Sequence, residues 1–375
     1  MQSTARHLIE WRPTDRIQPG KRRMHPRTSP GSGLWKEFSG SLSAKKVEAL
    51  ARERQLKFLH TSKPVKAETW DLLNEKLFAA RPDVTLQISG TSSATCDLSF
   101  LRQLPNLRSF SVNYHSKVRG IEEVACLRNL ESLAVWVYSL ESFDFLDAVP
   151  HRKLRSLRLG ATKSRKPKLS SLLKFDRLCD LVLDGQQNDI EVISQLPQLE
   201  ELVLRSVTVG GLEFLKKLKH LWLLRVVLGG ISNLAALKGM NSIKSLELLR
   251  VRGVKDIAVI STLIGLQYMG LQDLPRVLAI PDLSQLRSLR RVLLENMKGL
   301  KNVSSLAKAP ALEEFIYNKA RGKEPDHFAD LLKSKSLKKI WVGFGSQKKN
   351  DALADLAAQA GIKPSKFPHG GFKFR

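Results

Sequence analysis

Three stretches from the middle of the chain carry the same order of apolar residues: Leu199-Glu-Glu-Leu-Val-Leu204, Leu221-Trp-Leu-Leu-Arg-Val226 and Ile243-Lys-Ser-Leu-Glu-Leu248. In each stretch the first, fourth and sixth positions are apolar. The fourth and sixth positions alternate with the residue between them, which is the period of a β-strand with one buried face. The pattern therefore predicts short strands that turn their leucines toward a common core.

This pattern returns at regular intervals along most of the chain. It begins at Leu107, Leu130, Leu154, Leu178, Leu199, Leu221, Ile243, Leu266, Leu289, Leu312 and Leu337. The average spacing is 23 residues, and individual spacings are 21 to 25 residues. A second apolar group at helical spacing follows, as at Leu212, Leu215 and Leu218, and predicts a short helix or 3₁₀ turn on the other side of the core. Because no repeat can bury its apolar face alone, we expect the repeats to stack into one solenoid.

The repeat length and the L-x-x-L-x-L pattern resemble those of the leucine-rich repeat proteins, whose repeats have about 20–29 residues. The resemblance implies an α/β solenoid, a curved horseshoe that carries a parallel β-sheet on its concave face. Short helices or 3₁₀ turns would cover the convex face, and a cap would close each end. With one strand for each repeat and one over residues 84–88, we expect about twelve strands.

The chain departs from this family at one position of the repeat. Where the family has Asn or Cys, five residues after the second leucine, the chain has His115, Tyr138, Thr162, Gln186, Val207, Gly229, Val251, Leu274, Met297, Ala320 and Gly345. The family's ladder of buried side-chain amides is therefore not expected. The turns must satisfy their backbone N–H and C=O groups by other means.

The composition predicts four segments along the chain. They are a basic disordered tail over residues 1–33, an N-terminal helical or α/β cap over 34–83, the repeat solenoid over 84–346, and a C-terminal capping helix with a basic aromatic tail over 347–375. In the N-terminal cap, Ser43 is expected to cap a helix that runs to Leu56. A second helix is expected over 67–80, and the last helix over 352–360.

The charge of the chain is its unusual property. Its 62 Lys and Arg residues stand against 36 Asp and Glu residues, which is a formal net charge of +26. This excess favours an acidic partner surface or a polyanion, and it says nothing about the fold. The three cysteines fit neither a metal cluster nor a disulfide framework, so we expect free thiols and a cytoplasmic protein. No stretch of about 20 apolar residues predicts a transmembrane helix, and the first residues do not form a secretory signal.

The sequence holds no visible constellation of catalytic residues. It has no Gly-x-x-x-x-Gly-Lys-Ser/Thr phosphate loop, no His-Glu-x-x-His zinc motif and no Gly-x-Ser-x-Gly nucleophile motif. The eight histidines are scattered without a recurrent spacing. We therefore predict no catalytic residue, no metal site and no cofactor, and a protein that is not an enzyme.

The residues between the leucines are predicted to form the concave surface, on the solvent side of the sheet. They mix aromatic, aliphatic and charged side chains, as protein-binding surfaces do. The predicted partner-binding residues are Trp136, Arg158, Asp184, Glu201, Arg205, Leu223, Arg225, Glu247, Tyr268, Arg291, Leu293, Glu295 and Trp341. The apolar side chains expected to be exposed there are Trp136, Leu223, Val227, Leu249, Tyr268, Leu293, Ile316 and Trp341.

These residues predict a monomeric protein-binding scaffold whose partner has an acidic surface. Inhibition of an enzyme or toxin, or service as a regulatory subunit, is one form of such binding by analogy at the level of the fold. The alternative is a nucleic-acid or anionic-surface binding protein that uses its N-terminal tail and the basic cluster over residues 151–174. The residues of this alternative are Lys21, Arg22, Arg23, Arg155, Lys163, Arg165, Lys166 and Lys168.

Overall fold

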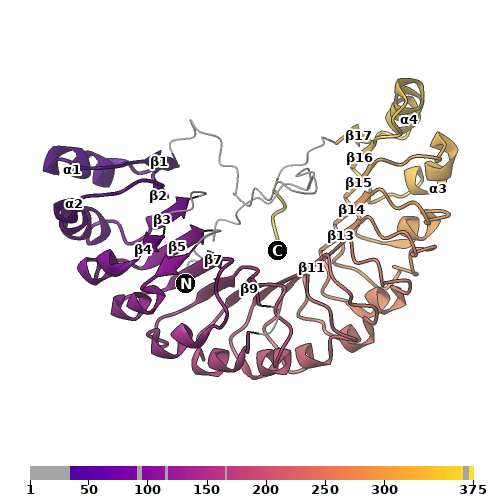
Figure 1. Cartoon of the computed structure of the whole chain (residues 1–375). Helices are drawn as coiled ribbons and strands as arrows, with labels where there is room; N and C mark the ends of the chain where they lie inside the picture. Colours follow the sequence, from indigo (N-terminus) through magenta and orange to yellow (C-terminus); the bar gives the residue numbers. More distant parts are fainter. Residues whose placement is uncertain (1–33, 91–94, 115–116, 165–166, 366–370) are drawn as a thin grey trace.

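The computed structural model describes residues 34–90, 95–114, 117–164, 167–365 and 371–375. The predicted tail over residues 1–33 lies outside this part of the chain. The described residues form a curved solenoid, with the strands along its inner side and the short helices along its outer side (Figure 1). The predicted α/β horseshoe with a concave parallel sheet is therefore confirmed.

In the described residues, one sheet contains fifteen strands. They are β1 (Trp35–Glu37), β2 (Phe58–Thr61), β3 (Thr85–Gly90), β5 (Ser109–Tyr114), β7 (Ser132–Val137), β8 (Ser156–Leu159), β9 (Asp180–Asp184), β10 (Glu201–Arg205), β11 (Leu223–Val227), β12 (Ser245–Leu249), β13 (Tyr268–Gln272), β14 (Arg291–Glu295), β15 (Glu314–Asn318), β16 (Lys339–Val342) and β17 (Lys363–Pro364). Two further strands, β4 (Cys96–Asp97) and β6 (Val118–Arg119), pair with each other on their own.

The four α-helices are α1 (Ala44–Arg52), α2 (Ala67–Leu72), α3 (Ala329–Leu332) and α4 (Gln347–Gln359). A π-helical stretch continues α2 over Leu73–Phe78. The 3₁₀ helices of the convex side are Ser99–Gln103, Ile121–Cys126, Asp144–Ala148, Ser170–Lys174, Ile190–Gln195, Glu213–Leu215, Ala235–Leu237, Ala258–Thr262, Ser304–Lys308 and Pro325–Phe328.

The long sheet is parallel throughout, and its strand order follows the chain. The expectation of about twelve strands is too low because both ends extend the sheet. At the N-terminal end β1 and β2 pair ahead of β3, and at the C-terminal end β17 pairs with β16. The caps therefore prolong the sheet as well as closing the core.

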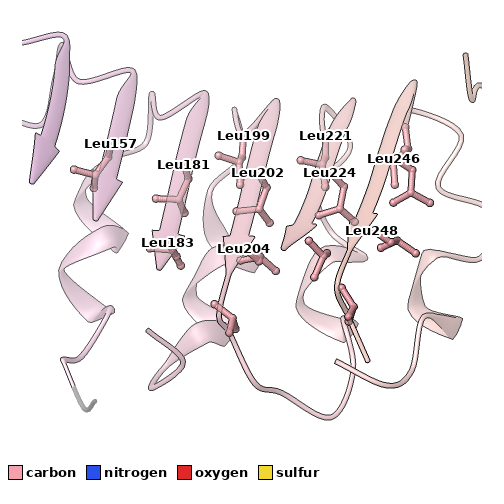
Figure 2. Close-up of a cluster of buried hydrophobic side chains, with 14 of the residues drawn as sticks. Leu157, Leu181, Leu183, Leu199, Leu202, Leu204, Leu221, Leu224, Leu246 and Leu248 are labelled. Carbon is pink, nitrogen blue, oxygen red and sulfur yellow. The ribbon is translucent and has the colours of Figure 1, made fainter. Parts of the chain in front are cut away.

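The leucines of the repeat form the core, in the predicted register. Cross-strand partners join Leu181, Leu202, Leu224 and Leu246 into one row, and each of these side chains is fully buried. Figure 2 shows these leucines and their neighbours on β8 to β12 lying together on one side of the sheet. Burial of each such side chain stabilises the fold by about 1.5–3 kcal/mol, so the continuous row is the main source of stability.

The helices at the two ends differ from the prediction in their bounds. Ser43 caps α1 as predicted, because its side chain accepts a hydrogen bond from the backbone N–H of Lys46. The helix ends at Arg52, four residues before the predicted Leu56. At the other end α4 begins at Gln347, five residues before the predicted start. These changes leave the buried faces of both helices on the core.

A backbone ladder takes the place of the absent amide ladder. The residue that follows each of six consecutive strands has a positive φ, between 50° and 61°: Ser206, Leu228, Arg250, Asp273, Asn296 and Lys319. In the first five, the backbone N–H donates to the last carbonyl of the next strand, at 2.8 to 2.9 Å, and the positive φ then turns the chain out of the sheet. Such a conformation costs a residue with a side chain about 1–2 kcal/mol. Each hydrogen bond of the ladder contributes about 0.5–1.5 kcal/mol, which is comparable to this cost.

The family's amide position is filled mainly by apolar side chains. Val207, Val251, Leu274 and Met297 are buried there and extend the core toward the turn. Two buried polar side chains also stand at this position. Gln186 accepts from the N–H of Asp184 and donates to the carbonyl of Gly160, and Thr162 donates to the carbonyl of Ser164. The expectation that the turns satisfy their backbone by other means is confirmed in these repeats.

Candidate interaction surface

The concave residues form three rows that run across the sheet, as the predicted register requires. The first row on β9 to β15 is Asp180, Glu201, Leu223, Ser245, Tyr268, Arg291 and Glu314. The middle row is Val182, Val203, Arg225, Glu247, Gly270, Leu293 and Ile316. The last row is Asp184, Arg205, Val227, Leu249, Gln272, Glu295 and Asn318. Trp341 continues the middle row on β16, and Arg158 precedes it on β8.

Most of the charged concave residues pair with each other. The ion pairs join neighbouring strands: Arg158 with Asp180, Arg205 with Asp184, Arg225 with Glu247, Arg291 with Glu314, and Lys319 with Glu295. Asp184 and Glu295 are almost completely buried, so their charges depend on these partners. The positive and negative side chains on this face therefore mainly form ion pairs within the sheet.

The concave face divides into two halves with different exposure. On β7, β8 and β10, which belong to the open half (β5 and β7 to β10), buried and half-buried side chains alternate. In the covered half (β11 to β16), all five residues of β13 are buried, and four of five on β14. The leucine pattern is the same in both halves, so the difference arises on the concave side of the sheet.

Trp136 is the large aromatic side chain of the open half. It lies half-buried on β7, with its ring against the backbone of Gly160 at the end of β8. A Cβ atom at position 160 would overlap this ring, so glycine is required there. The ring is thereby held against the sheet with part of its surface open to solvent.

The expected exposure is wrong for five of the apolar concave residues. Leu223, Val227, Tyr268, Leu293 and Ile316 point to the concave side as predicted, but all are at most 8% exposed. Tyr268, Leu293 and Ile316 form a second apolar cluster, separate from the core, with Trp341 and two phenylalanines of the chain's last residues packed against it. Burial raises the pKa of the Tyr268 phenol, and the negative charge of the nearby Glu247 carboxylate raises it further.

The tail segment, defined as Gly371–Arg375, provides this cover. It lies inside the curve of the solenoid (Figure 1). The ring of Phe372 lies 5.6 Å from the ring of Tyr268, and the ring of Phe374 lies 5.0 Å from that of Trp222. A basic aromatic tail was predicted here from the sequence, but its contact with the concave face was not.

The tail segment also makes polar contacts with the edge of the sheet. The side-chain amide of Gln267 accepts from the N–H of Arg375 and donates to its carbonyl, both at 2.8 Å. Arg290 donates to the carbonyl of Lys373, and the Arg375 guanidinium lies 3.6 Å from the Glu313 carboxylate. These edge residues precede strands β11 to β15, one position before the first concave row: Trp222, Lys244, Gln267, Arg290 and Glu313. The sequence analysis did not include these residues, because the concave surface that it predicted began one residue later in each repeat.

The chain matches no protein-family model, and no curated protein matches it. Solved structures match it along most of its length. An internalin from Listeria monocytogenes superposes with a TM-score of 0.54 at 16% sequence identity, over 80% of this chain and 88% of the internalin. A leucine-rich repeat protein from Leptospira interrogans superposes with a TM-score of 0.55 at 18% identity, over 82% of each chain. The chain has the leucine-rich repeat fold.

The described residues of the basic cluster over 151–174 are spread along the repeat. Arg155 precedes β8 and Lys163 follows it, so these residues lie at opposite ends of the strand. Lys168 is exposed in the loop that leads to the convex side. The other candidates for polyanion binding, Lys21, Arg22, Arg23, Arg165 and Lys166, lie outside the described residues. Polyanion binding stays a prediction.

The described part of this chain holds no group of three or more His, Cys, Asp or Glu residues that could bind a metal ion. None of the helices in the same residues has the length and apolarity that a membrane span needs.

Proposed function

We propose that this leucine-rich repeat protein binds another protein through the open half of its concave face, and that it acts by binding rather than by catalysis. The observation that carries the proposal is the alternation of buried and half-buried side chains on β7, β8 and β10. The half-buried side chains are not part of the core, and they combine one aromatic residue with small, aliphatic and charged neighbours. This is the composition of protein interfaces.

Trp136 and Arg158 are the proposed anchors of this surface. They lie on the adjacent strands β7 and β8, and Trp and Arg are the residue types that most often dominate binding energy. The Arg158 side chain keeps 32% of its surface exposed although it pairs with Asp180, so a partner carboxylate can still reach it. The concave charges pair among themselves, but the +26 charge of the whole chain favours encounter with an acidic partner.

The test compares capture of partners from the cells that make the protein. The baits are the wild type, a Trp136→Ala/Arg158→Ala variant, and a Leu278→Ala control whose side chain is 52% exposed in a loop away from the sheet. A partner of the open half binds the wild type and the control equally, and its affinity for the double variant falls at least about 30-fold, or about 2 kcal/mol. Equal affinity for all three baits overturns the proposal.

We also infer a cytoplasmic monomer with the domain division predicted from the sequence. Cys96, Cys126 and Cys179 are unbridged, which fits a reducing compartment. The mass in solution tests the monomer. Limited proteolysis tests the division, since cleavage within residues 1–33 should leave the solenoid intact.

A further inference from the structure

In the covered half of the concave face, the chain's own residues 371–375 lie against the sheet. We propose that this surface is a site that binds an extended segment of a partner protein that carries two aromatic side chains one residue apart, followed by a basic residue, and that Gly371–Arg375 occupies it in place of that segment. The inference rests on the proposed function in that the partner is a protein. It concerns other strands, β11 to β16, and other residues.

The tail segment lies on the sheet in the manner of an extended ligand. Phe372 and Phe374 are half-buried, whereas Gly371, Lys373 and Arg375 are exposed. This alternation places residues i and i+2 toward the surface, as in an extended chain. The site therefore accepts side chains at a spacing of two residues and leaves the residue between them in solvent.

Aromatic contacts define the two positions that face the site. Phe372 is 5.6 Å from the Tyr268 ring, and the guanidinium groups of Arg290 and Arg291 lie over it at 4.8 and 5.1 Å. Flat side chains with a π-face satisfy both kinds of contact, and aliphatic side chains do not satisfy the second. The first position therefore selects an aromatic residue.

The second position is formed by Trp222. The Phe374 ring lies 5.0 Å from the Trp222 ring at an angle of 67°, and 4.8 Å from Phe372 at 83°. Edge-to-face packing of this kind stabilises by about 0.5–1.5 kcal/mol beyond the burial of area. The two aromatic rings, which are separated by one residue in sequence, also pack against each other, so the pair is recognised as a unit.

The main chain of the segment forms hydrogen bonds of its own, in addition to the contacts of its side chains. The Gln267 amide, only 7% exposed, pairs with both the N–H and the carbonyl of Arg375, and Arg290 donates to the carbonyl of Lys373. These bonds are available to any extended segment, whatever its sequence. Affinity then comes from the main chain and selectivity from the aromatic pair, as in other modes of peptide recognition.

Charge adds a preference for a basic residue after the aromatic pair. The Arg375 guanidinium lies 3.6 Å from Glu313, and both side chains are partly exposed. A cavity of about 390 Å³ lies beside Arg375 at the edge of the sheet. Its lining includes Arg287 and Lys338. A partner segment can therefore extend beyond the basic residue into this cavity.

The tail segment is an exchangeable occupant and not part of the core. The cluster that it covers is separate from the continuous leucine core, which closes beneath it. Because the segment is tethered to the solenoid, its effective concentration at the site is on the order of millimolar. A partner segment of the same chemistry must compete with it.

The test uses a fluorescent synthetic peptide with the sequence of residues 371–375 and a chain that lacks these residues. The peptide should bind the shortened chain saturably and the full chain at least tenfold more weakly, because the tethered segment competes. A peptide with both phenylalanines changed to alanine should bind the shortened chain at least tenfold more weakly. In the shortened chain, Tyr268→Ala should cause a similar loss, and the Leu278→Ala control should cause none.

Three results would overturn the inference: no saturable binding to the shortened chain, equal affinity of the full and shortened chains, or equal affinity of the two peptides. If the shortened chain melts at a lower temperature, the full-length Phe372→Ser/Phe374→Ser variant takes its place in the same assay. A dimer of the full chain that is lost on removal of residues 371–375 would assign the segment to a second copy and also overturn the inference.

The outcome is independent of the test of the proposed function. Trp136→Ala/Arg158→Ala should leave peptide binding unchanged, because both residues lie in the open half. If the peptide does not bind, the proposed function of the open half is unaffected. If the open half captures no partner, the result of the peptide assay is unaffected.

Discussion

The open and covered halves of the concave face have the same leucine pattern and different surfaces. On β10 every second side chain is half-buried, whereas on β13 all five are buried. The middle row shows the contrast directly: Val203 is partly exposed, and Leu293, four strands further along, is 4% exposed. Strand geometry decides which way a side chain points. Whether it meets solvent is decided by a segment far away in the sequence.

On the core side of the sheet, the two halves should be equally buried. Truncation of a core leucine tests this, and it should give the largest changes in stability. Leu202 on β10 and Leu294 on β14 are both fully buried among leucines. Leu202→Ala and Leu294→Ala should each lower the free energy of unfolding by about 3 kcal/mol, from lost burial and the cavity left behind. Urea denaturation measures both. A difference of more than about 1.5 kcal/mol between them would show that the halves differ in the core as well.

The concave side should show the difference. Leu293→Ala should cost about 2 kcal/mol because the tail segment and its neighbours bury the side chain, and Val203→Ala in the same row should cost less than about 1 kcal/mol. In a chain without residues 371–375 the cost of Leu293→Ala should fall by about 1 kcal/mol. Urea denaturation of the four chains completes this cycle. An unchanged cost would mean that the segment does not cover the cluster in solution.

The backbone ladder joins the halves between β10 and β11, at Ser206. This residue is exposed and has a φ of 54°. Ser206→Gly should raise the free energy of unfolding by about 0.5 kcal/mol, and Ser206→Val should lower it by about 1 kcal/mol, since a β-branched side chain tolerates this conformation least. Thermal melting of the two variants measures opposite shifts. Shifts of the same sign would contradict the positive φ.

The smallest effect concerns two carboxylates outside the long sheet, one before the open half and one in the covered half, which should behave alike. The guanidinium of Arg119 and then the backbone N–H of Ser99 lower the pKa of Asp97 to about 2. Because this pKa lies below the ordinary value of about 3.9, the stabilisation is present above about pH 4 and is lost as the pH falls toward 2.

Asp97→Asn should therefore be slightly less stable than the wild type at pH 7, with a gap that narrows below pH 4. Hydrogen bonds from Ser284 and Lys308 lower the pKa of Asp282 in the covered half in the same direction, and Asp282→Asn should follow the same course. Urea midpoints at pH 7, 4 and 2.5 check this. A constant gap for either variant would contradict the lowered pKa.

Much of the fold could be predicted because its signal is local and repeated. The alternation around Leu202 or Leu246 is read within six residues, and eleven copies exclude chance. The caps were harder, since α1 and α4 each occur once and their ends depend on packing. For the candidate site, the sequence predicted which side chains point to the concave face but not which of them are exposed. The reason is that Tyr268 and Phe372 are more than a hundred residues apart and share no periodic pattern.

The sequence by itself determined the repeat, its register and the side of the sheet on which each residue lies, because these follow from the two-residue period of a strand. It also determined that no amide ladder could form. Only the tertiary structure decided that positive-φ residues such as Ser206 join the turns, and that concave charges such as Arg291 and Glu314 pair across strands. It also decided which half of the face stays open, since the contact between Gln267 and Arg375 spans 108 residues and exists only when the chain is folded.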